Sequence, residues 1–189
     1  MKLPGIFCLE GEWDDDLRRR RSVLPILELF ERLGIARYVH RDVATREELA
    51  YYLKRWRLKS YQDYQLLYLA MHGDIGELDL GRDTLRLPDL AELIRGKAAG
   101  RTIYFGSCWT MLEDEAELQR FVRTTGATAA VGFSEEVDWL ESAGFEVFLI
   151  QKLLQGRRSD AFFASITREH PALVGKLGLT VATKTKTYY

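Results

Sequence analysis

Three short, continuously apolar segments constrain the fold of this chain more than any other feature. They span residues 66–71, 102–105 and 129–133. Apolar runs without polar alternation are typical of strands that are buried on both faces within a parallel sheet. Stretches with the i, i+3, i+4, i+7 spacing of amphipathic helices separate these runs along the chain. The alternation predicts an α/β fold: a three-layer sandwich with helices on both faces of a mostly parallel central sheet.

Local signals extend this pattern toward both ends of the chain. A first strand is expected at residues 5–9 and a short second strand within residues 35–40. Thr45 and Glu48 have the spacing of a capping box, which begins a helix. A longer helix is expected over residues 139–154. No linker, repeat or change of composition interrupts residues 1–189, so we expect one domain.

The segment 77–87 departs from the strand–helix alternation. Polar and apolar residues alternate there on both sides of Gly81-Arg82-Asp83, a pattern typical of a β-hairpin. Pro88 and Asp89 then begin a helix. A hairpin at this position is not needed to build the sheet, so it marks a particular family.

Composition excludes several classes of protein. The 27 Lys and Arg residues nearly balance the 28 Asp and Glu residues, which gives a net charge of −1 and no basic excess for binding nucleic acid. No apolar run approaches the ~20 residues that a membrane helix needs. Two cysteines are too few for a disulfide framework, so we expect a reducing, cytoplasmic environment. No residues have the spacing of metal ligands or of a phosphate-binding loop, and we expect no metal and no cofactor.

Chemically useful residues follow two of the apolar runs. His72 and Gly73 come after the first run, and Ser107 and Cys108 come after the second. Ligands bind at the carboxyl ends of strands in an open parallel sheet, and neighbouring strands lie ~4.8 Å apart. If these strands are neighbours, His72 can take the proton of the Cys108 thiol and return it to a leaving group. The N–H groups of Gly73 and Cys108 are candidates for an oxyanion hole.

These motifs together resemble the caspase-like clan of cysteine peptidases, and the CHAT-type domains are the nearest branch. The resemblance lies in the run that ends in His72-Gly73, the hairpin, Pro88-Asp89-Leu90, and the run that ends in Ser107-Cys108. It extends to about residue 163, whereas the N-terminal third agrees only in its pattern.

The resemblance implies an endopeptidase with a Cys108–His72 dyad, in which Gly73 donates to the oxyanion. It also implies a regulated, bacterial-type effector with a protein or peptide substrate and a regulatory sensor protein as partner. The substrate pocket would come from the end of the fourth strand and from the loop at residues 134–139. Its expected residues are Ser107, Trp109, Glu135, Asp138 and Trp139. The acidic residues of that loop suggest the hypothesis of a basic residue before the scissile bond.

Alternatives remain open for each of these assignments. The chain can be a catalytically idle caspase-like module that binds a partner, or a flavodoxin-like binder of small ligands, although the latter does not explain the hairpin. Cys108 can be a small buried hydrophobe, and the loop acids can simply favour the positive end of a helix dipole. We expect Cys8 in the core, and His40 and His170 in solvent or at the ends of elements.

Overall fold

A seven-stranded sheet with the order β10-β9-β8-β7-β3-β1-β2 forms the centre of the protein. The structure is a computed structural model, and it describes residues 3–16 and 18–189. Five neighbouring strands are parallel, and the last two are antiparallel to their neighbours. The strands are β1 (Gly5–Glu10), β2 (Arg37–Asp42), β3 (Leu66–Ala70), β7 (Thr102–Gly106), β8 (Ala129–Phe133), β9 (Leu179–Ala182) and β10 (Thr187–Tyr188).

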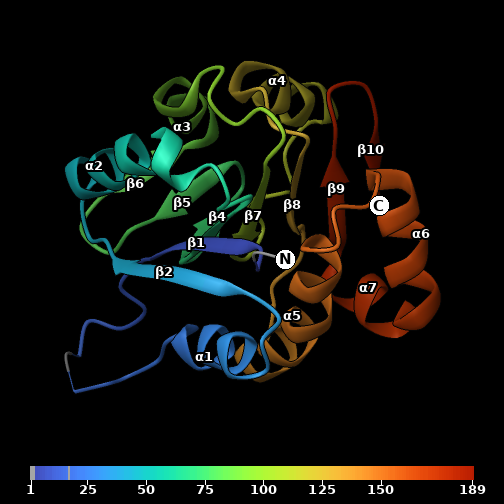
Figure 1. The fold of residues 1–189 in the computed structure, drawn as a ribbon, viewed down its shortest axis with the longest axis horizontal. Helices are drawn as coiled ribbons and strands as arrows, with labels where there is room; N and C mark the ends of the chain where they lie inside the picture. The colour runs from blue at the N-terminus through green and yellow to red at the C-terminus, as the bar shows by residue number, and fades with distance from the viewer. Residues whose placement is uncertain (1–2, 17) are drawn as a thin grey trace.

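Helices cover both faces of this sheet (Figure 1). One face carries α2 (Arg46–Trp56), α3 (Leu87–Ile94) and α4 (Glu115–Thr125). The other carries α1 (Leu24–Arg32), α5 (Trp139–Leu153), α6 (Ser159–Glu169) and α7 (Pro171–Leu177). A short 3-10 helix, Lys59–Tyr61, follows α2. The predicted three-layer α/β sandwich with a mostly parallel sheet is confirmed.

The apolar runs form strands because both of their faces are buried. Along β3, Leu67 and Leu69 pack into the core beneath α2, α3 and α4, whereas Leu66 and Tyr68 pack into the core beneath α1 and α5. Successive side chains of a strand point to opposite faces, so only a continuous apolar run satisfies two cores at once. Cys8 belongs to the second core, as expected.

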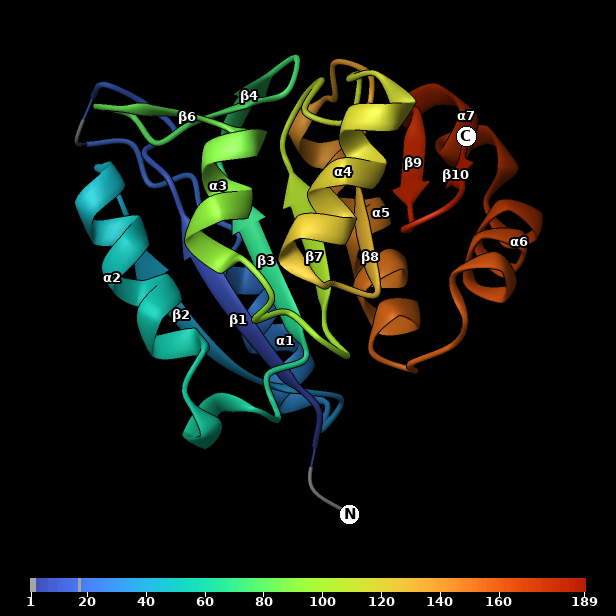
Figure 2. The same cartoon turned by 90° about the horizontal axis from the view of Figure 1, so that it is seen from above.

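The predicted hairpin is present and gains a third strand. β5 (Glu77–Asp79) pairs with β6 (Thr84–Arg86), and β4 (His72–Asp74) pairs with the other edge of β5. This small sheet lies at the carboxyl ends of the parallel strands (Figure 2). Leu78 and Leu85 anchor it in the core beneath α3. His72 is therefore held in β4, the strand that directly follows β3.

The C-terminal elements go beyond what the sequence pattern predicts. α6, α7 and β9 follow the long helix α5, and β9 pairs with β8 from Ala130↔Ala182 to Phe133↔Leu179. β9 has four residues, which is too short for periodicity to distinguish a strand from a turn.

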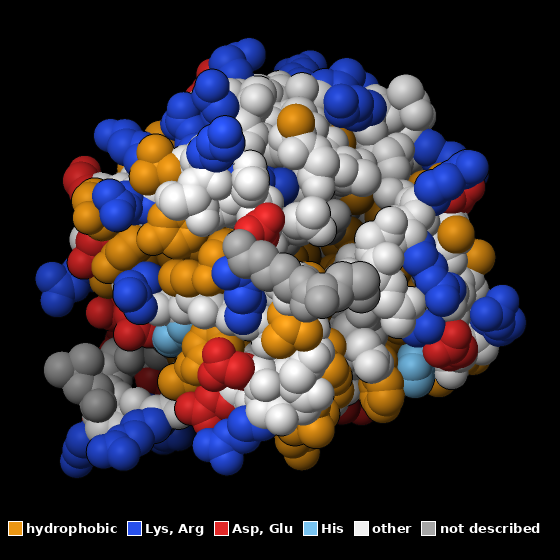
Figure 3. Space-filling model, in the orientation of Figure 1, with side chains coloured by type: hydrophobic (Ala, Val, Ile, Leu, Met, Phe, Trp, Pro, Cys, Tyr) orange, Lys and Arg blue, Asp and Glu red, His pale blue; other side chains and the backbone are white. Residues whose placement is uncertain are grey.

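Charged side chains of both signs are spread over the face of the molecule that Figure 3 shows. Lys and Arg lie around the rim of the face in Figure 3, with Asp and Glu between them, and do not gather over one element. Within residues 3–16 and 18–189, no helix combines the length and the apolar character that crossing a membrane requires.

The capping box of α2 gives a first test of the fold. The Thr45 hydroxyl accepts a hydrogen bond from the Glu48 N–H at 3.3 Å, and the Thr45 N–H donates to the Glu48 carboxylate at 3.2 Å. Thr45→Ala removes the first bond, and we expect it to lower the free energy of unfolding in urea by about 1 kcal/mol. Ser60→Ala, at an exposed position of the 3-10 helix, is the control. Equal effects of the two substitutions would contradict the role of this cap.

Candidate functional site

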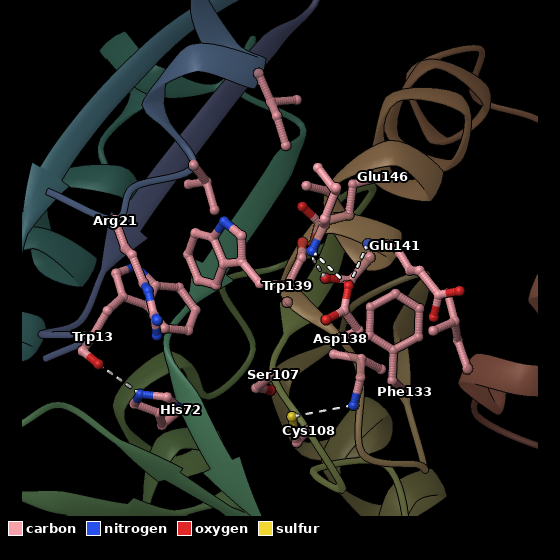
Figure 4. A pocket seen from close by; sticks show the side chains of 18 of the residues that line it. Trp13, Arg21, His72, Ser107, Cys108, Phe133, Asp138, Trp139, Glu141 and Glu146 are labelled. Carbon is pink, nitrogen blue, oxygen red and sulfur yellow. Dashed lines mark hydrogen bonds between the residues drawn. The ribbon is translucent and has the colours of Figure 1, made fainter.

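A cavity of about 920 Å³ opens at the carboxyl ends of the parallel strands. His72, Ser107 and Cys108 line one part of it, and the indole rings of Trp13 and Trp139 stand beside them (Figure 4). The two indole rings contact each other edge to face, with their centroids 4.5 Å apart. Strands β3 and β7, which precede the histidine and the cysteine, are neighbours in the sheet. The topology thus brings the two predicted catalytic residues to one cavity.

Cys108 lies in a tight turn directly after β7. Its half-buried Sγ accepts a hydrogen bond from the Val137 N–H at 3.5 Å. Trp109 has a φ of +52°, and in the described part of the chain it is the one residue besides glycine with a positive φ. A left-handed bulky residue is strained, and such strain persists where the surrounding structure imposes it. Here the Trp109 N–H donates to the Glu135 carbonyl at 3.3 Å, which ties the turn to the neighbouring loop.

His72 is oriented by the main chain of the N-terminal third. Its Nε2 lies 2.9 Å from the carbonyl oxygen of Trp13, and their rings are in edge contact at 5.1 Å. A carbonyl oxygen only accepts, so Nε2 carries the hydrogen and a neutral ring has its lone pair at Nδ1. No hydrogen bond joins the His72 ring to Cys108 among the residues described.

Gly73 is the point at which the histidine segment touches the cysteine turn. A Cβ atom at this position would lie 2.3 Å from Thr110 Oγ1 and 2.7 Å from the Cys108 carbonyl oxygen. The hydroxyls of Ser107 and Thr110 are hydrogen-bonded to each other at 2.6 Å within this turn. None of the described residues accepts a hydrogen bond from the Cys108 N–H. Glycine at position 73 therefore permits the close approach of the two segments.

Only part of the acidic loop after β8, residues 134–139, lines the cavity. The Asp138 carboxylate accepts from the N–H groups of Leu140 and Glu141, both at 3.0 Å, and so caps α5. This is the alternative assignment for the loop acids, a charge at a helix N-terminus. Of the predicted substrate-binding residues, Ser107, Asp138 and Trp139 line the cavity, whereas Trp109 and Glu135 are not part of its lining.

The carboxylate of Glu10 is buried beside the site, although the sequence did not predict this. This carboxylate holds the segments 11–16 and 18–23 between β1 and α1, which we call the N-terminal loop. Glu10 ends β1 and is only 2% exposed. Its oxygens accept from Trp13 Nε1 at 2.6 Å, from the Val23 N–H and the Ser22 hydroxyl at 2.7 Å, and from His40 Nε2 at 2.5 Å. Burial raises the pKa of Glu10, but these hydrogen bonds outweigh it and the pKa lies below its usual value.

The contact with Glu10 corrects one prediction. His40, expected in solvent or at the end of an element, lies within β2, and its side chain is only 14% exposed and is paired with the Glu10 carboxylate. His170, by contrast, lies at the junction of α6 and α7, as expected for a histidine at the end of an element. A charged residue that directly ends an apolar strand was the one signal in the sequence for such a buried pair.

Glu10, His40 and Asp42 bring their ligand atoms within 4.8 Å of one another, which raises the question of a metal ion. Glu10 Oε1 already accepts from Trp13 and Val23, and Oε2 accepts from Ser22 and His40. Each carboxylate oxygen accepts about two hydrogen bonds. The carboxylate is thus saturated, and these residues do not fit a metal centre.

A second buried carboxylate, Glu146 on α5, lines the cavity. It is not among the site residues predicted from the sequence. It is 4% exposed, and the hydroxyls of Tyr68 and Tyr104 donate to its two oxygens at 2.8 and 2.7 Å. Burial raises its pKa to about 7, and the two hydrogen bonds only partly offset this effect. The signal in the sequence was a glutamate adjacent to Phe145 on the apolar face of the helix.

Comparison with known proteins gives a family but no activity. Residues 4–161 match a protein family described as a family of unknown function (DUF6642). A search of the curated proteins finds no match.

The close approach at Gly73 can be tested by substitution. Gly73→Ala forces a methyl group against Thr110 and the Cys108 carbonyl, and we expect it to lower the free energy of unfolding by about 1–3 kcal/mol. Gly144→Ala is the control, because nothing lies within 4 Å of a Cβ at that helical position. We expect this control to be neutral or stabilising by up to about 1 kcal/mol. Urea denaturation of both variants measures the difference, and a harmless Gly73→Ala would refute the contact.

The raised pKa of Glu146 predicts a pH-dependent stability. Its folded pKa of about 7 exceeds the usual 4.5, so its contribution is complete below pH 4.5 and is lost as the pH rises to about 7. We expect wild type to lose up to about 3 kcal/mol more than Glu146→Gln between pH 5 and pH 8. Urea denaturation at several pH values measures this. Parallel curves for the two proteins would refute it.

Proposed function

The chain belongs to the DUF6642 family, and we propose that it is a caspase-like cysteine endopeptidase with a Cys108–His72 dyad. The observation that carries the proposal is the contact of the His72-Gly73 segment with the Ser107-Cys108 turn in one cavity. A nucleophile and a base on neighbouring strand ends are the arrangement that acyl transfer needs. The hairpin between the two segments agrees with the resemblance to the caspase-like clan.

His72 acts as the base through Nδ1. The Trp13 carbonyl holds the Nε2 hydrogen, which leaves the lone pair of Nδ1 to take the proton of the Cys108 thiol. The thiolate sulfur then attacks the substrate carbonyl carbon, and a C–S bond forms as the carbonyl π bond breaks. Hydrogen bonds between a catalytic pair often form only when substrate is bound, so their absence in the free protein is compatible with this step.

The oxyanion and the leaving group complete the reaction. The unpaired N–H of Cys108 and the N–H of Gly73 stabilise the oxyanion. When the C–N bond breaks, the amine leaves with the proton held by His72. Water attacks the thioester with His72 as base, the C–S bond breaks, and the carboxylic acid and the thiol are released.

The proposal includes a cytoplasmic setting and a peptide substrate. Cys108 is a free, half-buried thiol that a reducing environment keeps available. Cys8 is fully buried, and burial strongly raises the pKa of its thiol, so it does not compete as a nucleophile. A regulatory sensor protein that controls access to the cavity remains part of this proposal.

The second candidate is a catalytically idle module of the same fold that binds a protein. The lack of a hydrogen bond between His72 and Cys108 favours it. The two candidates differ in the reactivity of Cys108, because an idle module gives His72 no effect on the thiol.

Thiol alkylation and N-terminal proteomics distinguish the two. We expect iodoacetamide at pH 7 to modify Cys108 and not Cys8, and His72→Ala to slow this reaction about tenfold, because the imidazole no longer takes the thiol proton. His170→Ala is the control and leaves the rate unchanged. Cells that express wild type should contain new protein N-termini that are absent with Cys108→Ala. If Cys108 is alkylated at the same rate in wild type and in His72→Ala, and no new N-termini depend on Cys108, the idle module is favoured.

A further inference from the structure

The carboxylate of Glu146 lies at the floor of the cavity, close to the proposed nucleophile. A Cβ atom built on Gly106 would lie 2.9 Å from Glu146 Oε1. Gly106 precedes Cys108 by two residues, so at most ~7 Å of chain separates these positions. The carboxylate is therefore within reach of a long side chain on a substrate residue next to the scissile bond.

Glu146 has hydrogen-bonding capacity that the protein does not use. The Tyr68 and Tyr104 hydroxyls supply one hydrogen bond to each oxygen. An ionised carboxylate has about four acceptor positions, so about two remain. In the part of the chain that the structure describes, no Lys, Arg or His forms an ion pair with Glu146. A buried charge without a partner is costly, and the raised pKa of this group reflects that cost.

Glu146 is one of the residues that line the cavity, although it is only 4% exposed. Gly106 also lines the cavity and packs closely against Glu146, because a Cβ atom at this position would lie 2.9 Å from Oε1 and 2.6 Å from the Tyr68 ring. The hydroxyls of the two tyrosines hold the carboxylate from the direction of the sheet. The cavity is therefore the side from which a substrate residue would reach Glu146.

The rest of the cavity suits a long cationic side chain. Its walls include the apolar side chains of Trp13, Met71, Phe133 and Trp139. The two basic residues of the lining already have acidic partners: Arg21 pairs with Asp14 at 3.7 Å, and Lys176 pairs with Glu141 at 2.6 Å. The lining thus offers aromatic and apolar surface for a methylene stem, and neither Arg21 nor Lys176 forms an ion pair with Glu146.

We propose that the cavity floor is a subsite for a Lys or Arg side chain of the substrate, with Glu146 as its counter-ion. The inference rests on the proposed peptidase function, because it places the residue before the scissile bond in this cavity. A cation supplies both the missing hydrogen bonds and the opposite charge, and charge-assisted hydrogen bonds are the strong ones. The basic preference is thereby assigned to a buried glutamate on α5 and not to the exposed acidic loop, where Asp138 caps a helix.

Peptides that differ only in the residue before the scissile bond test the subsite. We expect wild type to cleave Lys and Arg peptides with a kcat/KM about tenfold or more above that for the norleucine peptide, which lacks the charge. Glu146→Gln keeps the shape of the side chain. Its amide oxygen accepts from one tyrosine hydroxyl, and its NH2 group donates to the other hydroxyl. We expect the substitution to remove this preference, and a cooperative urea transition reports that the variant is folded.

Two further variants make the assignment specific. Glu136→Gln removes an exposed acid from the cavity rim, and we expect the preference for Lys and Arg to survive. Glu47→Gln, on the outer surface of α2, is the control for unchanged activity. If the preference disappears in Glu136→Gln and persists in Glu146→Gln, the assignment to Glu146 is wrong.

A binding experiment separates failure of the subsite from failure of the peptidase. In the Cys108→Ala protein, calorimetry should show the Lys peptide binding about tenfold more tightly than its norleucine twin, and Glu146→Gln should abolish the difference. Glu146-dependent binding without cleavage by wild type supports the subsite and overturns the peptidase. Cleavage without a basic preference overturns the subsite and leaves the peptidase standing.

Discussion

The burial of the central strands on both faces is the constraint on which the rest of this structure depends. Every residue of β1, β3 and β8 is buried, so the interior of the sheet has almost no room for polar chemistry. Polar side chains are accommodated where the strands end and the backbone turns away from the two cores. His72, Ser107 and Cys108 occupy such positions on neighbouring strands, and the small sheet β4-β5-β6 holds the histidine there. The site follows from the same packing that forms the fold.

Two glutamates are buried beside this site, and their surroundings give them opposite properties. Glu10 accepts four hydrogen bonds, one of them from His40, and its pKa falls below the usual value despite burial. Glu146 accepts two hydrogen bonds from neutral hydroxyls, and burial raises its pKa to about 7. The difference is the number of hydrogen-bond donors, since both carboxylates are removed from water. The acceptor positions of Glu10 are therefore all used within the fold, whereas Glu146 keeps about two unused acceptor positions.

The features that the sequence predicts well are those set by local or periodic patterns. The apolar runs, the capping box at Thr45 and the hairpin after β3 all depend on residues close in the chain. The positions of His72 and Cys108 follow from the rule that strand ends carry the site. Trp13 and His72 lie 59 positions apart, and Tyr68 and Glu146 lie 78 positions apart. Such contacts arise only when the layers pack. The hydrogen bonds that Glu10 forms to the N-terminal loop and those that Glu146 forms to the two tyrosines could therefore not be predicted.

The N-terminal loop connects these parts into one site. Glu10 fixes the loop by accepting from Trp13 at one end and from Val23 at the other. The same Trp13 holds His72 through its carbonyl and forms a wall of the cavity through its contact with Trp139. Any displacement of Trp13 changes the orientation of the histidine and the width of the cavity together. The orientation of His72 and the width of the cavity are thus coupled through Trp13, which the Glu10 carboxylate keeps in place.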